Sequence, residues 1–132
     1  MENIRTQYIC KNQIKKGRSG TRKILENIKK GNSVALMIDQ RVREGIEIDF
    51  FGNPASTTTI PAQLIKKYKC ELVPIYIERK KKYFFKMYIS NPIKISENKS
   101  TNEITEYLNK ILEAMILKNV DQWIWTHDRW KK

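Results

Sequence analysis

Histidine and cysteine, which often carry catalysis or bind metals, are scarce in this chain of 132 residues. His127 is the single histidine, and Cys10 and Cys70 are the two cysteines. Two cysteines are too few for a disulfide framework or a metal cluster, so we expect both to be reduced thiols. No serine or cysteine nucleophile motif accompanies His127, which indicates a histidine packed among the tryptophans near the C-terminus.

Long apolar runs are also absent. The N-terminal residues, MENIR, lack the apolar core of a signal peptide, and no stretch reaches the roughly 18 apolar residues of a transmembrane helix. We therefore expect no membrane-spanning segment, which leaves attachment to a membrane surface open. A glycine-rich phosphate loop, a zinc-binding spacing and an RNA-binding aromatic signature are missing as well.

Acidic residues are the third shortage: 14 Asp and Glu stand against 26 Lys and Arg, a formal net charge of +12. This surplus predicts attraction to an anionic partner, whether nucleic acid, an acidic membrane surface or an acidic protein. Hydrophobic residues make up 40% and charged residues 30%, which is typical of a folded chain rather than a disordered one. The length is consistent with one domain.

Three helices are expected from capping and periodicity. Ser19 is a plausible N-cap for the first, which Gly31-Asn32 ends. The second runs from Pro61, at a first-turn position, to about residue 69. The third follows Ser100, which forms a capping box with Glu103, and then repeats apolar residues at helical spacing.

Four strands are expected between these helices. Their ranges are 33–38, 46–50, 72–77 and 83–89, with the basic run 79–82 in the turn between the last two. The alternation of strands and helices predicts an α/β fold with a sheet covered by helices.

Candidate functional residues each have an ordinary structural alternative. Asp39 and Gln40 follow the strand expected at 33–38, where open α/β sheets bind ligands, although a carboxylate there also caps turns. Phe51 and Gly52 could line an apolar pocket or end a strand packed in the core. The basic run 79–82 is either a solvated turn or a patch for phosphate or an acidic partner.

The C-terminal tail is dense in tryptophan and basic residues. Trp123, Trp125 and Trp130 are equally consistent with core packing and with an aromatic belt at a membrane interface, beside the basic residues Arg129, Lys131 and Lys132.

Four motifs in this chain occur in the order and spacing of a known family. They are SVALMIDQ at 33–40, FFGNPA at 50–55, LVP at 72–74 and QWIWTHDRWK at 122–131. Over nearly its entire length the chain resembles the late acyltransferases of lipid A biosynthesis, the lauroyl and myristoyl transferase family.

The resemblance implies a glycerol-3-phosphate acyltransferase-like mixed sheet flanked by helices, at the cytoplasmic face of the bacterial inner membrane. The family moves a fatty acyl chain from acyl carrier protein to a hydroxyl of a phosphorylated lipid A precursor. In the family's proposed mechanism, a histidine oriented by an acidic residue deprotonates that hydroxyl, and no cofactor or metal is required. The carrier protein and the lipid are both anionic, so the net charge of +12 would favour the binding of both.

Two sets of residues become candidates, and the first is carried over from the family. Residues that resemble substrate-binding positions are Arg5, Asp39, Gln40, Phe51 and Gly52. The second comprises predicted contacts to the membrane or to an acidic partner, at Arg79, Lys80, Trp130 and Lys131. Of these Lys131, together with Arg129, matches the family's basic tail.

The family's catalytic motif, His-x-x-x-x-Asp or Glu, does not occur around His127, because residue 132 is a lysine. We therefore expect the motif and a membrane anchor to precede Met1. Residues 1–132 would then form a single partial acyltransferase domain, inactive alone. A basic module that binds anionic lipid or an acidic protein without chemistry is the alternative. Nucleic-acid binding is supported by charge alone, and we do not expect it.

Overall fold

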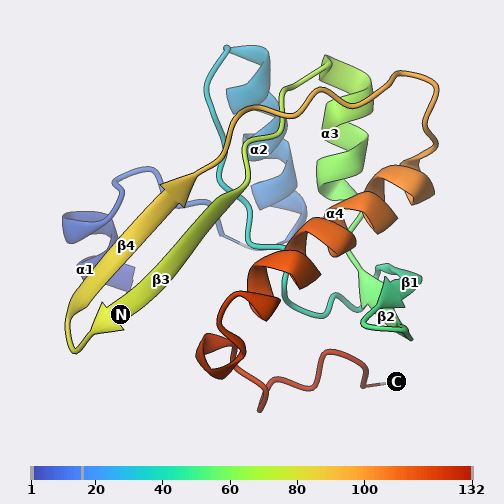
Figure 1. Cartoon of the computed structure of the whole chain (residues 1–132). Coiled ribbons are helices and arrows are strands. Elements are labelled where there is room, and N and C mark those ends of the chain that lie inside the picture. The colour runs from blue at the N-terminus through green and yellow to red at the C-terminus, as the bar shows by residue number, and fades with distance from the viewer. Residues whose placement is uncertain (1, 16, 132) are drawn as a thin grey trace. The chain divides into compact units, whose positions relative to one another are not determined.

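The computed structural model describes residues 2–15 and 17–131, apart from the side chains of Glu2, Asn3 and Arg5. It divides into two compact units, Met1–Ala35 and Leu36–Lys132 (Figure 1). All strands of the described chain belong to the second unit. The chain is a mixed α/β protein, which confirms the fold class at that level.

The first unit holds helices α1, over Glu2–Tyr8, and α2, over Arg18–Lys29. The N-cap of α2 is Gly17 with φ 107°, so the cap predicted at Ser19 is wrong, and Ser19 lies inside the first turn. Glycine adopts this positive φ without a steric penalty. At the other end Gly31, with φ 77°, follows the helix as predicted.

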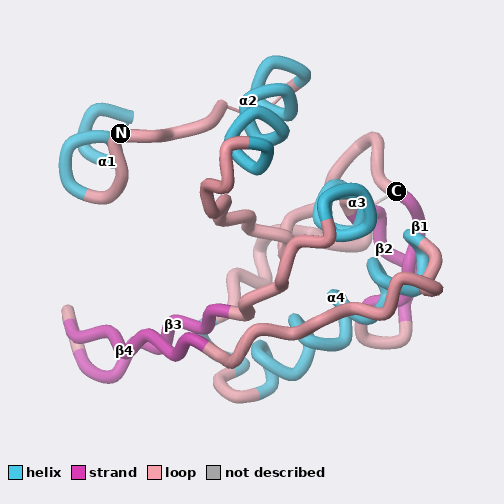
Figure 2. Tube along the Cα trace, turned by 90° about the horizontal axis from the view of Figure 1, so that it is seen from above, coloured by secondary structure: helices cyan, strands magenta, loops and turns pink. Residues whose placement is uncertain are grey.

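Strands in the second unit form two separate antiparallel hairpins, β1–β2 and β3–β4 (Figure 2). β1 spans Ile46–Phe50 and pairs with β2, over Asn53–Thr57. β3 spans Ile75–Lys81 and pairs with β4, over Phe84–Ile89. The prediction of one sheet covered by helices is therefore wrong. A tight turn joins the two strands of each hairpin, and no ladder of backbone hydrogen bonds links the two hairpins in the described structure.

Segment 33–38, predicted to be a buried strand, has no strand structure. Leu36 and Met37 are 38% and 82% exposed. An apolar run becomes a strand only where a neighbouring strand accepts its backbone hydrogen bonds, and no described segment pairs with this one.

The boundaries of β3 also differ from the prediction. Leu72 forms only an isolated bridge with Ile93, and the strand begins at Ile75, immediately after Pro74. The basic residues 79–81, predicted to lie in the turn, belong to β3, and the turn is at Lys82 and Tyr83. Proline has no backbone N–H to donate, which explains why the ladder starts after it.

Two helices build the core of the second unit. α3 spans Ile60–Tyr68 and α4 spans Thr101–Leu117, close to the predicted ranges, and a short 3₁₀ helix, η1, follows at Val120–Gln122. None of the described helices is long and apolar enough to cross a membrane.

The core consists of two apolar clusters. In the first, Ala62 and Ile65 of α3 pack against Ile104 and Leu108 of α4. In the second, Phe50 and Ala55 of the β1–β2 hairpin pack against Ile116 of α4, with Leu112, Trp123 and Trp130 beside them. α4 therefore supplies residues to both clusters.

The capping box that begins α4 is present: Ser100 Oγ accepts the Glu103 N–H at 3.2 Å, and Glu103 Oε2 accepts the Ser100 N–H at 2.7 Å. We expect Ser100→Ala to lower the free energy of unfolding by about 1 kcal/mol, because one N–H at the helix start loses its acceptor. Ser19→Ala, inside the first turn of α2, is the matched control and should leave the midpoint of urea unfolding unchanged or slightly raised. Equal losses in both variants would contradict the assignment of the cap.

Candidate functional site

The C-terminal tail is fixed to the β1–β2 hairpin by a buried arginine. Arg129 is fully buried, and its guanidinium donates to Ser56 O at 2.6 Å and to Thr57 Oγ1 at 2.8 Å. The same guanidinium lies 5.2 Å from the centre of the Phe50 ring, a cation–π contact. Arg129, which the sequence assigned to a basic tail, is therefore part of the core.

Asp39 lies close enough to Arg129 to influence the pKa of its guanidinium. Burial lowers the pKa of Arg129, and the negative charge of Asp39 acts in the opposite direction. Asp39 Oδ1 and Arg129 Nε are both buried and have no hydrogen-bond partner in the described structure. The carboxylate thus offsets the arginine's charge at a distance, without a direct ion pair.

The residues after Asp39 also contact the tail. The Arg41 N–H donates to His127 Nε2 at 3.2 Å, and Arg41 Nε donates to Lys131 O at 2.6 Å. Gln40, between these residues, is half-buried. An Nε2 that accepts a hydrogen bond carries the lone pair and not the proton, so this nitrogen is engaged in holding the loop.

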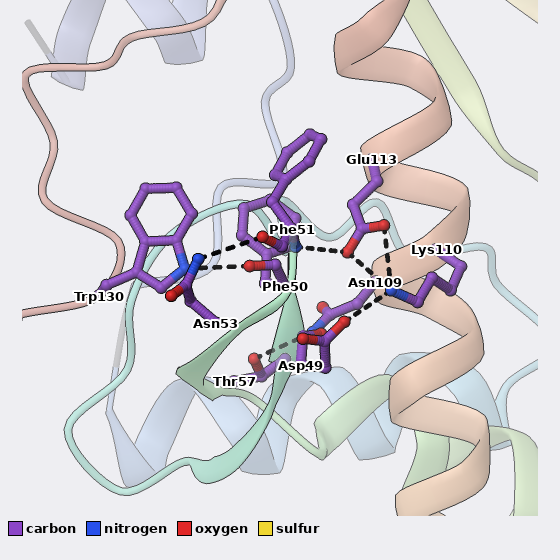
Figure 3. A network of polar contacts seen from close by, with 9 residues as sticks. All are labelled: Asp49, Phe50, Phe51, Asn53, Thr57, Asn109, Lys110, Glu113 and Trp130. Atoms are coloured by element: carbon purple, nitrogen blue, oxygen red, sulfur yellow. Dashed lines mark hydrogen bonds and ion pairs between the residues drawn. The ribbon is translucent and has the colours of Figure 1, made fainter.

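The Phe-Phe-Gly motif forms the turn of the β1–β2 hairpin. Phe51 and Gly52 are its two central residues, with φ 52° and 75°, as a type I′ turn requires. Positive φ is strained for a bulky residue such as Phe51. The turn is held by Glu113 of α4, whose Oε1 accepts the Phe51 N–H at 2.7 Å, and by Asn53, whose Nδ2 donates to Phe51 O at 3.1 Å (Figure 3).

Polar side chains of α4 bind the rest of β1 (Figure 3). Lys110 Nζ lies 2.6 Å from Asp49 Oδ2 and 3.2 Å from Glu113 Oε2. Asn109, fully buried, donates from Nδ2 to Asp49 O at 2.8 Å. The turn and strand β1 are therefore fixed against α4 by side chains of three residues, at positions 109, 110 and 113.

Aromatic rings surround the inner side of the turn. The rings of Phe51, Trp123 and Trp130 lie 4.9, 5.8 and 5.7 Å from that of Phe50. Trp130 is half-buried, and its Nε1–H donates to Phe50 O at 3.0 Å. Of the two interpretations of the tail, the geometry favours core packing for Trp123 and Trp130, while Trp125 is 49% exposed.

The structure brings part of the predicted site together. Asp39, Phe51 and Trp130 all lie around the buried Phe50–Arg129 pair, whereas Arg79 and Lys80 lie on strand β3 and Lys131 is exposed. The Arg5 side chain is outside the described part of the structure. No group of three or more His, Cys, Asp or Glu side chains in the described chain is placed to hold a metal ion.

Sequence reasoning missed Asn109, Lys110 and Glu113. A signal was available, because residues 105, 109 and 113 repeat at a spacing of four beside the apolar face of α4 and are all polar. Polar residues at this spacing next to a core face indicate a buried polar contact.

Residues 9–132 match the model of a protein family described as bacterial lipid A biosynthesis acyltransferases. The chain belongs to this family. The recognition from four sequence motifs is thus confirmed, and with it the assignment to an acyltransferase family of lipid A biosynthesis. No individual curated protein matches the chain. The lipid A acyltransferase match begins at residue 9, so Arg5 precedes it.

Arg129 gives the site its first test. We expect Arg129→Met to lower the free energy of unfolding by about 2–3 kcal/mol, because the acceptors on Ser56 and Thr57 lose a charged donor and Asp39 loses its compensating charge. Lys131→Met is the control: it removes an exposed charge and should change stability little. Equal stability of the two variants in urea titrations would show that the buried guanidinium contributes nothing.

The Asp49–Lys110 pair gives a pH prediction. The hydrogen bond from Lys110 lowers the pKa of Asp49 below its ordinary value of 3.8. A carboxyl whose pKa is lowered on folding stabilises the fold above its unfolded pKa, and this stability is lost as the pH falls through the folded pKa. We expect the melting temperature of the native chain to fall more steeply below about pH 4 than that of Lys110→Met.

The control for this prediction is Lys94→Met, which removes a lysine whose Nζ is 4.0 Å from Glu71 Oε1. This long, exposed pair should contribute little, so the variant should keep the native pH profile. Parallel profiles for Lys110→Met and the native chain would rule out a contribution from the Asp49 pair.

Proposed function

We propose that this chain forms part of an enzyme that transfers a fatty acyl chain from acyl carrier protein to a hydroxyl of a phosphorylated lipid A precursor. The observation that carries the proposal is the family match over residues 9–132. In this proposal residues 1–132 are one part of a glycerol-3-phosphate acyltransferase-like domain. The domain works at the cytoplasmic face of the inner membrane, with this chain peripheral to it.

The Phe51–Gly52 turn is the proposed border of the acyl-chain site. It presents a half-buried aromatic ring next to the cluster of Phe50, Trp123 and Trp130, and Glu113 fixes the turn from α4. Apolar contact with a fixed aromatic edge suits a saturated chain, which offers only dispersion and burial. The strain at Phe51 is consistent with a functional position.

Asp39 and Gln40 act as support in this proposal. Asp39 lies near the buried charge of Arg129, and Arg41, directly after Gln40, is bound to the tail through His127 and Lys131. These contacts hold loop 39–41 against the hairpin, so substitutions at Asp39 should act through the position of the turn.

The base of the reaction is proposed to come from outside residues 1–132. It removes the proton of the acceptor hydroxyl, whose oxygen attacks the thioester carbonyl. The carbon–sulfur bond then breaks, and the carrier's thiolate leaves and takes up a proton. His127 is unsuited to this role because its Nε2 accepts the Arg41 N–H. No cofactor is needed for these steps.

Purified chain, incubated with acyl-loaded carrier protein and the lipid A precursor, should bind the loaded carrier but give no transfer above buffer. Because the chain carries +12 and the carrier is acidic, binding should weaken as ionic strength rises. Transfer that disappears in His127→Ala would identify His127 as the base, and transfer that survives would locate the base elsewhere in the chain. Either result would overturn the proposed origin of the base.

The positive control for this test is a longer protein expressed from the reading frame upstream of Met1. A longer product that includes a His-x-x-x-x-Asp or Glu motif should catalyse transfer, and Phe51→Ala in that product should raise the KM for the acyl donor. Asn98→Ala is the matched control, since its side chain is exposed and uncharged and lies outside the predicted contacts. If that longer product is inactive, the transfer function is wrong for this chain.

A further inference from the structure

One side of the β3–β4 hairpin is apolar and largely exposed, although Asp121 and Gln122 of η1 lie beside Ile77, Arg79 and Phe85. The register pairs Ile75 with Ile89, Ile77 with Met87 and Arg79 with Phe85, so these side chains share one face. The five apolar members are between 48% and 66% exposed. An apolar surface of this kind on a two-stranded sheet marks a contact with another apolar phase or partner.

The turn of the hairpin exposes two aromatic rings. Tyr83 is 90% exposed and Phe84 is 73% exposed. In Figures 1 and 2 this turn lies at the end of the hairpin farthest from α3. Aromatic rings at a projecting end, one of them with a hydroxyl, are suited to the boundary between lipid headgroups and acyl chains.

The same hairpin is strongly basic. Between residues 75 and 89 there are five basic residues, Arg79, Lys80, Lys81, Lys82 and Lys86, against one acidic residue, Glu78. Glu78 is already engaged, 2.7 Å from Lys80 Nζ and 3.0 Å from the Tyr88 hydroxyl. The charge that remains is positive and lies next to the exposed rings.

Contacts inside the chain occupy the opposite face of the hairpin and part of the outer edge of β3. On the opposite face the rings of Tyr76 and Tyr88 lie 5.9 Å apart, and Lys118, at the end of α4, lies over Tyr76. At the outer edge of β3, Gln122 pairs with the backbone of Arg79 through two hydrogen bonds of 2.8 and 2.9 Å. Gln122 blocks strand addition at this point, which disfavours pairing with a second copy along β3.

We propose that the β3–β4 hairpin docks on an anionic phospholipid bilayer, with Tyr83 and Phe84 inserted at the interface. Lys81 and Lys82 contact headgroup phosphates, and the apolar face of the hairpin lies toward the acyl chains. Exposed apolar area, interfacial aromatic residues and adjacent cations are together the features that bind a membrane surface. The proposal rests on the proposed function only in the choice of a bacterial phospholipid.

Vesicle flotation tests the docking. The native chain should float with vesicles of phosphatidylcholine that contain phosphatidylglycerol, and not with pure phosphatidylcholine. Lys81→Glu/Lys82→Glu should lower the partition coefficient at least about tenfold, since each cation near an anionic surface contributes on the order of 1 kcal/mol. Lys23→Glu/Lys29→Glu on α2 makes the same change of net charge at exposed positions and should lower it much less.

Insertion is tested separately from attraction by charge. In a Cys10→Ser/Cys70→Ser chain, an environment-sensitive fluorophore attached at Tyr83→Cys should shift to the blue on anionic vesicles. The same fluorophore at Asn98→Cys, an exposed position in the same unit, should not. Tyr83→Ser/Phe84→Ser should weaken binding to anionic vesicles while the circular dichroism spectrum stays native.

Two outcomes would overturn the proposal. Hairpin variants that float like the native chain would show that other residues bind the lipid. Hairpin variants that keep vesicle binding but lose binding to acyl carrier protein would assign the surface to that acidic protein. Neither readout requires acyl transfer, so a failure of the proposed function leaves the flotation result interpretable.

Discussion

The packing of α4 against two different partners is the constraint on which the second unit depends. Its N-terminal half packs on α3 through Ile104 and Leu108, and its C-terminal half packs on the β1–β2 hairpin through Ile116. Neither a nine-residue helix nor a two-stranded hairpin is stable in water without such a partner. The capping box that starts α4 therefore affects both clusters, since it fixes where the helix begins.

The candidate site follows from the same helix. Strand β1 and its turn take their polar contacts from Asn109, Lys110 and Glu113, which follow the apolar stripe of α4 at its edge. From the other side, Arg129 and Trp130 close over Phe50. The strained φ of Phe51 persists because α4 and the C-terminal tail both bind the turn that contains it. A turn held from both sides is fixed in position, as the proposed border of an acyl-chain site requires.

Local signals in the sequence predicted local structure well. The alternation of Ile46, Ile48 and Phe50 predicted β1, and Ser100 with Glu103 predicted the start of α4. Signals that depend on distant partners were misleading. Segment 33–38 has the composition of a buried strand but no neighbour to pair with, and Arg129 is basic yet buried because Ser56, Thr57 and Phe50 lie around it. The four ordered motifs identified the family, since order and spacing retain information that composition loses.

The two basic regions of the chain differ in what surrounds them. In the tail, Arg129 is buried and donates hydrogen bonds within the chain, and the carboxylate of Asp39 offsets its charge. In the β3–β4 hairpin, the cations stand beside exposed aromatic and aliphatic side chains with a single, already engaged carboxylate. A desolvated guanidinium with internal partners stabilises one packing arrangement. Solvated lysines next to an apolar surface can instead bind the phosphate of another molecule. Net charge alone cannot make this distinction. It depends on which cations the fold has already paired, which is why the proposed membrane contact lies on the hairpin rather than on the tail.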